Sequence, residues 1–271
     1  MRFVPKKADD SINVSKEHPL VEAGTLVIGL TLIIAAIAAV LILIVDLVLL
    51  FVSPEKEAAM FADWLPDGIV AVEEEDKRVV ELQALTERLA RHWEDSPYEF
   101  RVEISADDDL NAMALPGGLI IVTSGLLDRV ESENELAFVL GHEIGHFRNR
   151  DHIRALGRGI VLSIFFVAIS GGDSVANLGM TISDLTLRGF SREQEANADE
   201  FGLKLVYEEY GHVAESWRFF ERIGDKDDAL VDLATYLSTH PSPDDRVERM
   251  IELAESNGWP VTGPVVEPEV Y

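Results

Sequence analysis

A long apolar run near the amino end limits the folds open to this chain. From Leu26 to Val52 the sequence is apolar except for Thr31 and Asp46, over 27 residues. As a helix, this run would span about 40 Å, which exceeds the thickness of a bilayer's hydrocarbon core. A cleaved signal peptide is the alternative, but its apolar region is usually only about 7–15 residues long. The run therefore predicts an uncleaved transmembrane anchor at residues 24–53.

The charges beside this run predict its orientation. Four basic residues precede it: Arg2, Lys6, Lys7 and Lys16. Only Lys56 follows it closely, between Glu55 and Glu57. Because basic flanks stay in the cytoplasm, residues 1–23 are expected to form a cytoplasmic arm and the bulk of the chain to lie outside. In a Gram-negative cell this would be a single-pass inner-membrane protein with a periplasmic domain.

Asp46 is unusual inside a membrane span. An intramembrane carboxylate is by default a functional candidate. Asp46 also lies seven residues before Ser53. The alternative is therefore a place near the outer interface, where the carboxylate would reach water or pair with a neighbouring chain.

Charge and cysteine content exclude several functions. Asp and Glu total 49 against 23 Lys and Arg, which gives a formal net charge of −26. This charge argues against nucleic acid or an anionic lipid surface as a partner, and favours a solvated acidic exterior. The chain has no cysteine. Disulfides and thiol catalysis are thus excluded, and any zinc site must use His, Asp and Glu.

An HExxH motif occurs at His142, Glu143 and His146. On a helix, residues four apart lie on one face roughly 6 Å apart along the axis, so both imidazoles can bind one metal ion. Ser132 and Glu135 form a capping box before an apolar stripe of helical period, which favours a helix here over a chance match. Glu143 would lie beside the metal without binding it and act as general base towards a water molecule.

Glu195 and Asp199 place two acids on one face of a second helix, expected from Ser191 to Tyr210. Burying an acid is costly unless it is paired or bound to a metal. Glu195 is the best candidate for a third metal ligand, and Asp199 would orient a ligating imidazole. The alternative is a buried salt bridge with Arg188 or Arg192.

The remaining pattern predicts a mainly α fold with a small β-sheet, an α+β domain at residues 73–258. A linker at residues 54–72 would precede it and a loose tail at 259–271 would follow. Alternating or short apolar runs predict strands at Phe100–Ile104, Asn111–Leu115 and Gly118–Thr123. Amphipathic runs predict helices at Glu73–Asp95, Val213–Ile223, Asp227–Leu237 and Pro243–Ser256.

The segment from Gly159 to Ser170 is apolar over 12 residues. It is too short to cross a membrane unaided. Two interpretations stay open: a helix buried in the domain, or a segment that dips into the outer leaflet.

Four motifs in order resemble those of the CAAX-prenyl-protease and HtpX-like zinc metallopeptidases. They are Asn111–Gly118, His142–His146, Glu195–Asp199 and Thr239–Arg246. The resemblance covers Glu73 to Ser256 and implies a gluzincin fold. It also implies one zinc ion held by His142, His146 and Glu195, with Glu143 as catalytic base and Asp199 beneath a histidine ligand. The domain at 73–258 would then be a zinc metallopeptidase domain.

The resemblance also gives His240 and Arg246 a place over the zinc. His240 would either stabilise the oxyanion of the reaction or cap the zinc as a fourth ligand and silence the enzyme. Arg246 is likewise a candidate for steadying the oxyanion. Because this chain has one sure span, it looks closer to single-anchor or periplasmic quality-control members than to multi-span ones.

These features predict a membrane-anchored zinc endopeptidase that cuts misfolded or membrane-associated proteins. A latent or non-catalytic zinc-binding assembly factor or chaperone at the membrane is the alternative. The expected partners are protein or peptide substrates, the membrane, and membrane proteins or a second copy of the chain. An exposed strand edge could hold an extended peptide, although the sheet could also serve only for packing. The residues expected there are Asn111, Ala112, Met113, Ala114, Pro116, Gly117 and Gly118.

Overall fold

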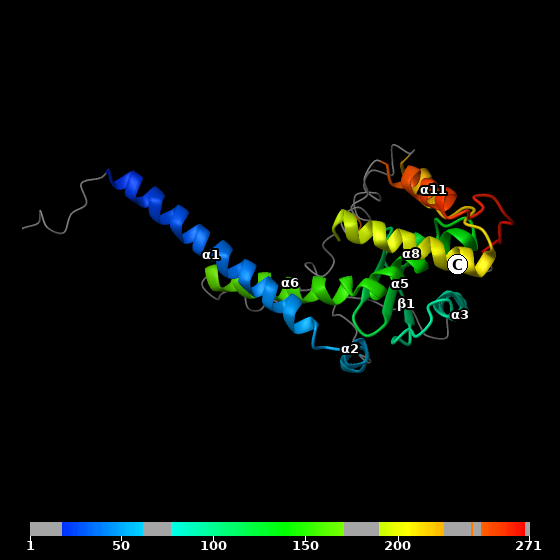
Figure 1. The fold of residues 1–271 in the computed structure, drawn as a ribbon, viewed down its shortest axis with the longest axis horizontal. Coiled ribbons are helices and arrows are strands. Elements are labelled where there is room, and N and C mark those ends of the chain that lie inside the picture. Colours follow the sequence, from blue (N-terminus) through cyan, green and yellow to red (C-terminus); the bar gives the residue numbers. More distant parts are fainter. Residues whose placement is uncertain (1–17, 62–76, 171–189, 225–239, 241–244, 269–271) are drawn as a thin grey trace, which may run out of the picture.

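An apolar helix projects from the rest of the chain in the computed structural model, which describes residues 18–61, 77–170, 190–224, 240 and 245–268. This helix, α1 (Pro19–Leu49), extends well beyond the domain (Figure 1). None of its residues is buried. Within the described part of the chain, it is the one helix long and apolar enough to cross a membrane.

Three strands form a small mixed sheet in the order β1 (Arg101–Ser105), β3 (Leu119–Thr123), β2 (Ala112–Leu115). β1 runs parallel to β3, and β2 runs antiparallel to it. The β2–β3 turn uses Gly117 and Gly118, whose φ angles of 90° and 82° suit glycine. Within the described sheet β2 is an edge strand, so one side of its backbone faces away from β3.

The core lies between this sheet and the helices α3 (Lys77–Ala90), α5 (Glu133–Asn149) and α8 (Arg192–Tyr210). α5 is buried from Glu133 to Phe147. A Cβ on Gly145 would lie 2.8 Å from Cα of Ala198, and a Cβ on Gly202 would lie 2.8 Å from N of His142. Glycine therefore lets α5 and α8 pack backbone to backbone, which brings the two motif-bearing helices together.

A polar cluster fastens the anchor to the domain. We call it the anchor joint, and it consists of four side chains: Glu57, Tyr98, Arg150 and His152. Arg150 ends α5 in the left-handed conformation, and its Nη1 donates to the carbonyls of Leu49 (3.0 Å) and Val52 (2.8 Å). Glu57, in α2 (Pro54–Phe61), is fully buried and accepts from Arg150 (2.9 Å), Tyr98 (3.2 Å) and His152.

Helix α6 (Asp151–Ser170) leaves the domain and lies against α1 (Figure 1). Its Arg158 donates to both oxygens of Asp46, at 3.1 and 3.2 Å. Water or a neighbouring chain was the partner expected for this carboxylate under one of the two interpretations of Asp46. The structure instead pairs it within the chain, with a residue 112 positions later, a distance in sequence at which helical periodicity carries no information.

The fold class is confirmed: the chain is mainly α with a small sheet and one amino-terminal apolar helix. Several boundaries differ from those expected. α3 ends at Ala90 rather than Asp95, and α6 begins at Asp151 rather than Gly159. The carboxyl-terminal helices are α9 (Arg218–Gly224) and α11 (Arg246–Ser256), and a short α4 (Ser124–Leu127) follows β3. The expected helix at 227–237 and the first residues of the one expected from 243 lie outside the described residues.

The tail differs from the loose segment expected. The amide of Glu133 donates to the carbonyl of Val266, and the amide of Val266 donates to Oδ1 of Asn134, both at 2.9 Å. Trp259 stacks on Tyr207 with ring centroids 5.4 Å apart. The tail is ordered as far as Val266 because the first turn of α5 offers amides without helical partners, which composition does not reveal.

Candidate metal centre

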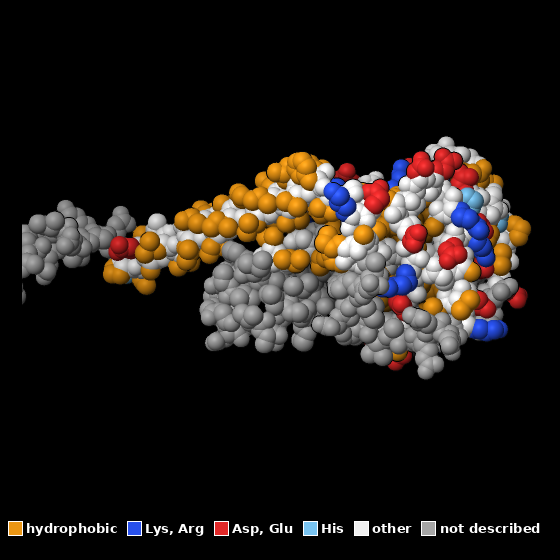
Figure 2. Space-filling model, turned by 90° about the horizontal axis from the view of Figure 1, so that it is seen from below, with side chains coloured by type: hydrophobic (Ala, Val, Ile, Leu, Met, Phe, Trp, Pro, Cys, Tyr) orange, Lys and Arg blue, Asp and Glu red, His pale blue; other side chains and the backbone are white. Residues whose placement is uncertain are grey.

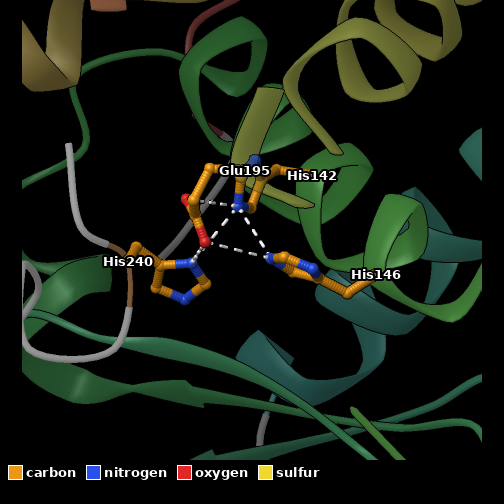
Figure 3. Close-up of side chains that lie close together, drawn as sticks. All are labelled: His142, His146, Glu195 and His240. Atoms are coloured by element: carbon orange, nitrogen blue, oxygen red, sulfur yellow. Dashed lines mark hydrogen bonds and ion pairs between the residues drawn. The ribbon is translucent and has the colours of Figure 1, made fainter. Parts of the chain in front are cut away.

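Helices α5 and α8 bring three predicted ligands to one point (Figure 3). The Nε2 atoms of His142 and His146 lie 3.1 Å apart, with the rings nearly perpendicular. Glu195 faces both of them: Oε2 lies 3.5 Å from Nε2 of His142, and Oε1 lies 3.6 Å from Nε2 of His146. All three side chains are buried.

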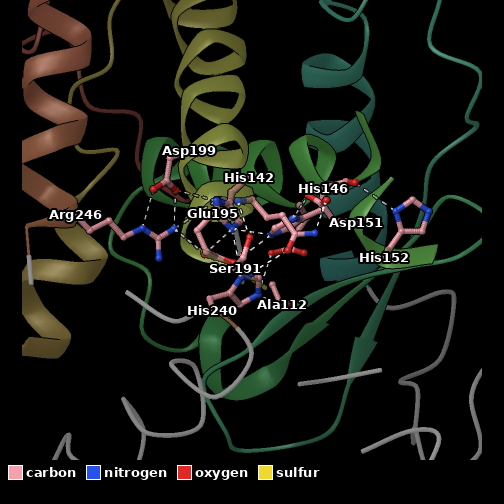
Figure 4. A network of polar contacts seen from close by, with 12 residues as sticks. Ala112, His142, His146, Asp151, His152, Ser191, Glu195, Asp199, His240 and Arg246 are labelled. Atoms are coloured by element: carbon pink, nitrogen blue, oxygen red, sulfur yellow. Dashed lines mark hydrogen bonds and ion pairs between the residues drawn. The ribbon is translucent and has the colours of Figure 1, made fainter. Parts of the chain in front are cut away.

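The other ring nitrogen of each histidine contacts a buried carboxylate (Figure 4). Nδ1 of His142 lies 2.9 Å from Oδ1 of Asp199, and Nδ1 of His146 lies 3.1 Å from Oδ2 of Asp151. Gln194 in turn donates to Oδ1 of Asp151 at 2.6 Å. Such carboxylates place the ring hydrogen on Nδ1 and leave Nε2 with its lone pair.

The protonation states explain what can bind between these residues. Burial lowers the pKa of His142 and of His146 despite the carboxylates beside them, so both rings are neutral near pH 7. Burial alone would raise the pKa of Glu195, but its ionic contacts, with that to His240 as the largest, lower it to about 2. Two lone pairs and a carboxylate therefore face one another without a proton between them. Such a set repels itself unless a cation lies in its centre, so the residues fit a metal ion.

His240 completes a group of four candidate ligands whose donor atoms lie within 4.8 Å of one another. Its Nδ1 lies 3.2 Å from both Oε1 of Glu195 and Nε2 of His142. Its Nε2 lies 3.3 Å from the carbonyl oxygen of Ala112 and 3.5 Å from Oε1 of Glu143. Burial opposes the charged form, but Glu195 and Glu143 outweigh it and raise the pKa of His240. The first pair of contacts suits a fourth ligand, and the second pair suits an oxyanion contact.

Arg246 lies behind the ligands rather than over them. Its Nη2 donates to Oδ1 of Asp199 at 2.6 Å and its Nε to Oδ2 at 3.0 Å. The guanidinium carbon lies 4.2 Å from the centre of the Phe220 ring, and the side chain is buried. Because Asp199 takes this bidentate contact on the Nδ1 side of His142, the contacts do not match the expected oxyanion role. Asp199 does form a buried salt bridge, but with Arg246 and not with Arg192; Arg188, the other expected partner, lies outside the described residues.

Glu143 and β2 border the same space. Both carboxylate oxygens of Glu143 are buried without a hydrogen bond from any described residue, and Nε2 of His240 is their ionic neighbour. Of the expected substrate strand, Ala112 contacts the metal centre, through His240. Gly117 and Gly118 instead pack against the backbones of Phe61 and Glu99. The turn is therefore a packing element, and only the start of β2 lies at the site.

Sequence reasoning did not identify three neighbours of His146. Asp151 and Gln194 form the carboxylate–amide pair described above. Phe190 stacks on the imidazole with ring centroids 3.8 Å apart. Gln194 had a local signal only as a capping residue, and its amide serves both roles, since its Oε1 accepts from the amide of Ser191 at 2.9 Å.

Two imidazoles and a carboxylate around one cation position, with a buried glutamate beside them, define the class of HExxH metallopeptidase centres. The sequence model of Peptidase family M48 matches residues 76–254, so the chain belongs to this family. The resemblance drawn from the sequence is thus confirmed.

Named relatives cover part of this chain. It is 31% identical to "Metalloendopeptidase OMA1, mitochondrial" of Danio rerio over 214 residues, 72% of this chain and 44% of the relative. It is 27% identical to "Metalloprotease LoiP" of Escherichia coli over 65% of this chain and 71% of the relative. It is also 27% identical to "Beta-barrel assembly-enhancing protease" of Yersinia pestis, over 55% and 33%. The chain spans less than half the length of the OMA1 relatives.

Proposed function

We propose that this chain is a zinc endopeptidase anchored in the membrane by α1, with His142, His146 and Glu195 as the zinc ligands. The observation that carries the proposal is the pair of facing Nε2 atoms, 3.1 Å apart, whose Nδ1 partners are both carboxylates. A set of two histidines and one glutamate is typical of catalytic zinc, because it leaves a coordination position open. Membership of family M48 supports the same activity.

The chain's own residues divide the chemistry of peptide hydrolysis between them. Bound zinc would act as a Lewis acid towards the peptide carbonyl and the attacking water. Glu143 would accept the proton of that water and then deliver it to the leaving amine, since its carboxylate is buried and takes no hydrogen bond from the described part of the chain. Asp199 and Asp151 would fix the two imidazoles, and Arg246 would hold Asp199 ionised as a positioning residue.

The edge of β2 would bind the substrate as an added strand. Its first residue, Ala112, lies beside His240, so a peptide paired there would run across the metal centre. Hydrogen bonding to the backbone recognises the extended conformation of a substrate peptide more than it recognises the side chains. This suits substrates that are unfolded, and the proposed class is misfolded or membrane-associated proteins. Similarity to a β-barrel assembly-enhancing protease supports a role in quality control.

The placement proposed for the protein is the inner membrane, with the amino end in the cytoplasm and the peptidase domain outside. The basic residues before the apolar run and the acidic flank after it support this orientation. The proposed domain limits remain residues 73–258 for the peptidase and 24–53 for the span.

Replacing Glu143 by Gln tests the proposal. The variant should keep its zinc, because Glu143 is not a ligand, and should cleave casein at least about 100-fold more slowly, as expected for loss of a general base. Glu252→Gln, an exposed position on α11, is the matched control and should cleave at the wild-type rate. Zinc is measured by metal analysis of the purified full chain. Equal cleavage by the Glu143 variant and wild type would refute the peptidase assignment.

His240→Ala separates the two roles of that residue. If His240 caps the zinc, the variant should be faster than wild type, because the open coordination position is uncovered. If His240 steadies the oxyanion, the variant should be slower by about 10²–10³-fold. The contact of Nδ1 with both ligand side chains favours a latent state, in which the chain would bind zinc and protein without cutting. Initial rates of casein cleavage decide the matter.

A further inference from the structure

The length of α1 that lies before Asp46 matches a bilayer. From Leu26 to Val45 there are 20 residues without a charged side chain, which as a helix span about 30 Å, the thickness of the hydrocarbon core. Large apolar side chains are exposed along this whole stretch, among them Leu26, Leu32 and Val40. Asp46 therefore marks the level at which hydrocarbon gives way to the interface on the side of the domain.

Helix α6 crosses this level beside α1. Its Arg158 pairs with Asp46, and its Gly157 lies so close to α1 that a Cβ there would come within 2.5 Å of the Val45 side chain. The two helices run antiparallel, and α6 continues away from the domain after the ion pair (Figure 1). The side chains of Asp46 and Arg158 are 35% and 42% exposed, as suits charges at an interface rather than in a core.

The part of α6 beyond the ion pair has the composition of a membrane segment. The 12 residues from Gly159 to Ser170 carry no charge and would reach about 18 Å along the helix, more than half of the hydrocarbon core. The first large side chain of this part, Ile160, is 39% exposed. In Figure 2 apolar side chains cover the projecting part of the molecule, whereas charged side chains gather on the domain.

The opposite side of the ion pair is polar. A cavity of about 850 Å³ lies where α1, α6 and α8 meet. Its lining includes Asn149, Arg154, Ser191 and Gln194. A cavity with so many charged and amide groups in its lining belongs outside the hydrocarbon. The polar cavity on one side of Asp46 and the apolar part of α6 on the other therefore both place the membrane interface at the level of Asp46.

We propose that α6 beyond Arg158 inserts into the leaflet on the side of the peptidase domain, next to α1, and that the Asp46–Arg158 pair sets its depth. The partner of this surface is the lipid bilayer itself, bound through apolar contact. A net charge of −26 gives no electrostatic attraction to anionic lipid. We therefore expect α6 to insert into a bilayer of neutral lipid.

The insertion has a consequence for the site. Arg150 joins the end of α5 to the last carbonyls of α1, and His146 lies about one helical turn before Arg150. With α1 and α6 both in lipid, the metal centre is held close to the membrane surface. On the proposed peptidase function, cleavage would then occur near the point where a substrate leaves the bilayer.

Single cysteines test the insertion, because the chain has none of its own. Ile160→Cys and Ala168→Cys report on α6, Leu32→Cys on α1, and Val80→Cys on an exposed part of α3. Each full-length variant is labelled with the fluorophore NBD and placed in phosphatidylcholine nanodiscs. Nitroxide-labelled phosphatidylcholine then quenches any probe that touches lipid chains. Variants are compared only if their thermal midpoints match wild type, and the two α6 positions serve as replicates.

The expected result is a loss of fluorescence at both α6 positions as large as at Leu32, with little loss at Val80. A nitroxide near the chain end should quench Ala168 more than Ile160, and one near the headgroup should do the reverse. If Leu32 is quenched and both α6 positions behave like Val80, the insertion of α6 is wrong while the anchor stands. If Leu32 itself is not quenched, the anchor is wrong and the insertion falls with it.

Discussion

Two buried polar clusters, one on α5 and one just beyond its end, are balanced in opposite ways. At the anchor joint a single carboxylate, Glu57, meets three donors, from Arg150, Tyr98 and His152. At the metal centre, acceptors face acceptors: two Nε2 lone pairs and the carboxylate of Glu195. The carboxylate of the joint is matched by donors of the chain itself, whereas the metal centre is complete only with a cation.

This difference shows how a buried charged cluster that stabilises the fold can be distinguished from one that binds a ligand. A cluster whose donors match its acceptors needs nothing from outside and stabilises the fold. A cluster whose acceptors are held together by a second layer of carboxylates is kept unbalanced by the protein itself. Asp199, Asp151 and Arg246 form that second layer, so changes there should separate stability from metal binding.

The largest effect is expected from Arg246→Ala. It leaves the buried carboxylate of Asp199 without its bidentate partner, and breaking such a pair costs about 3–5 kcal/mol of stability. Thermal unfolding of the detergent-solubilised chain, followed by tryptophan fluorescence, measures the loss. Arg249→Ala is the control one turn further along α11, where the side chain is 37% exposed and the cost should stay below about 1 kcal/mol. Similar losses in both variants would mean that Arg246 acts only as a surface charge.

Asp151→Asn should weaken metal binding more than it weakens the fold. The amide no longer fixes the hydrogen of His146 on Nδ1, and loss of such a partner typically costs about 10–100-fold in metal affinity. Competition with a chromophoric chelator measures the affinity directly. Asp128→Asn, an exposed residue after α4, is the control and should leave the affinity unchanged. Wild-type affinity in the Asp151 variant would remove Asp151 from the second layer.

A smaller and pH-dependent effect is expected at the joint, from Glu57→Gln. Burial raises the pKa of Glu57, but His152 and Arg150 outweigh it, so the pKa in the folded chain lies below the ordinary value of 4.5. The carboxylate therefore adds stability above about pH 4.5, and this contribution is lost as the pH falls through the lower folded-state pKa. Glutamine keeps part of the hydrogen bonding, so the loss near pH 7 should be about 1 kcal/mol.

Thermal midpoints measured from pH 7 down to pH 3 check this prediction. The curves of wild type and the Glu57 variant should converge towards the acid end, because protonation removes the same charge. Glu55→Gln, exposed on the same helix, is the control and should change the stability by less than about 0.5 kcal/mol at every pH. Parallel curves for the Glu57 variant and wild type would show that its charge does not stabilise the joint.

Local sequence patterns predicted the helices that carry the metal ligands. They did not predict which residues far apart in sequence would pair. The HExxH spacing and the capping boxes at Ser132 and Ser191 depend on residues within one or two turns, and both helices begin where these caps predict. The carboxylates that the periodicity placed inward on α8, Glu195 and Asp199, do lie at the metal centre.

The remainder depends on turns of the chain that periodicity does not encode. Asp151 reaches His146 because Arg150 adopts a left-handed conformation and reverses the chain between α5 and α6. A helical pattern continued past Asn149 would have placed Asp151 elsewhere. Arg246 and Asp46 find their partners 47 and 112 residues away, at separations about which helical periodicity carries no information.

The glycine contacts between α5 and α8 bear on which ion the centre accepts. They fix the separation of two helices, one carrying the nitrogen donors and the other the oxygen donor, and neither backbone can move closer. The distance between the donor atoms therefore limits the radius of the ion that fits between them. Zinc bonds of about 2.0–2.2 Å require donors closer together than calcium bonds of about 2.3–2.6 Å do. A methyl group at Gly145 would clash with Ala198 and increase the distance between α5 and α8. The glycines at this contact would therefore favour a small ion at the metal centre.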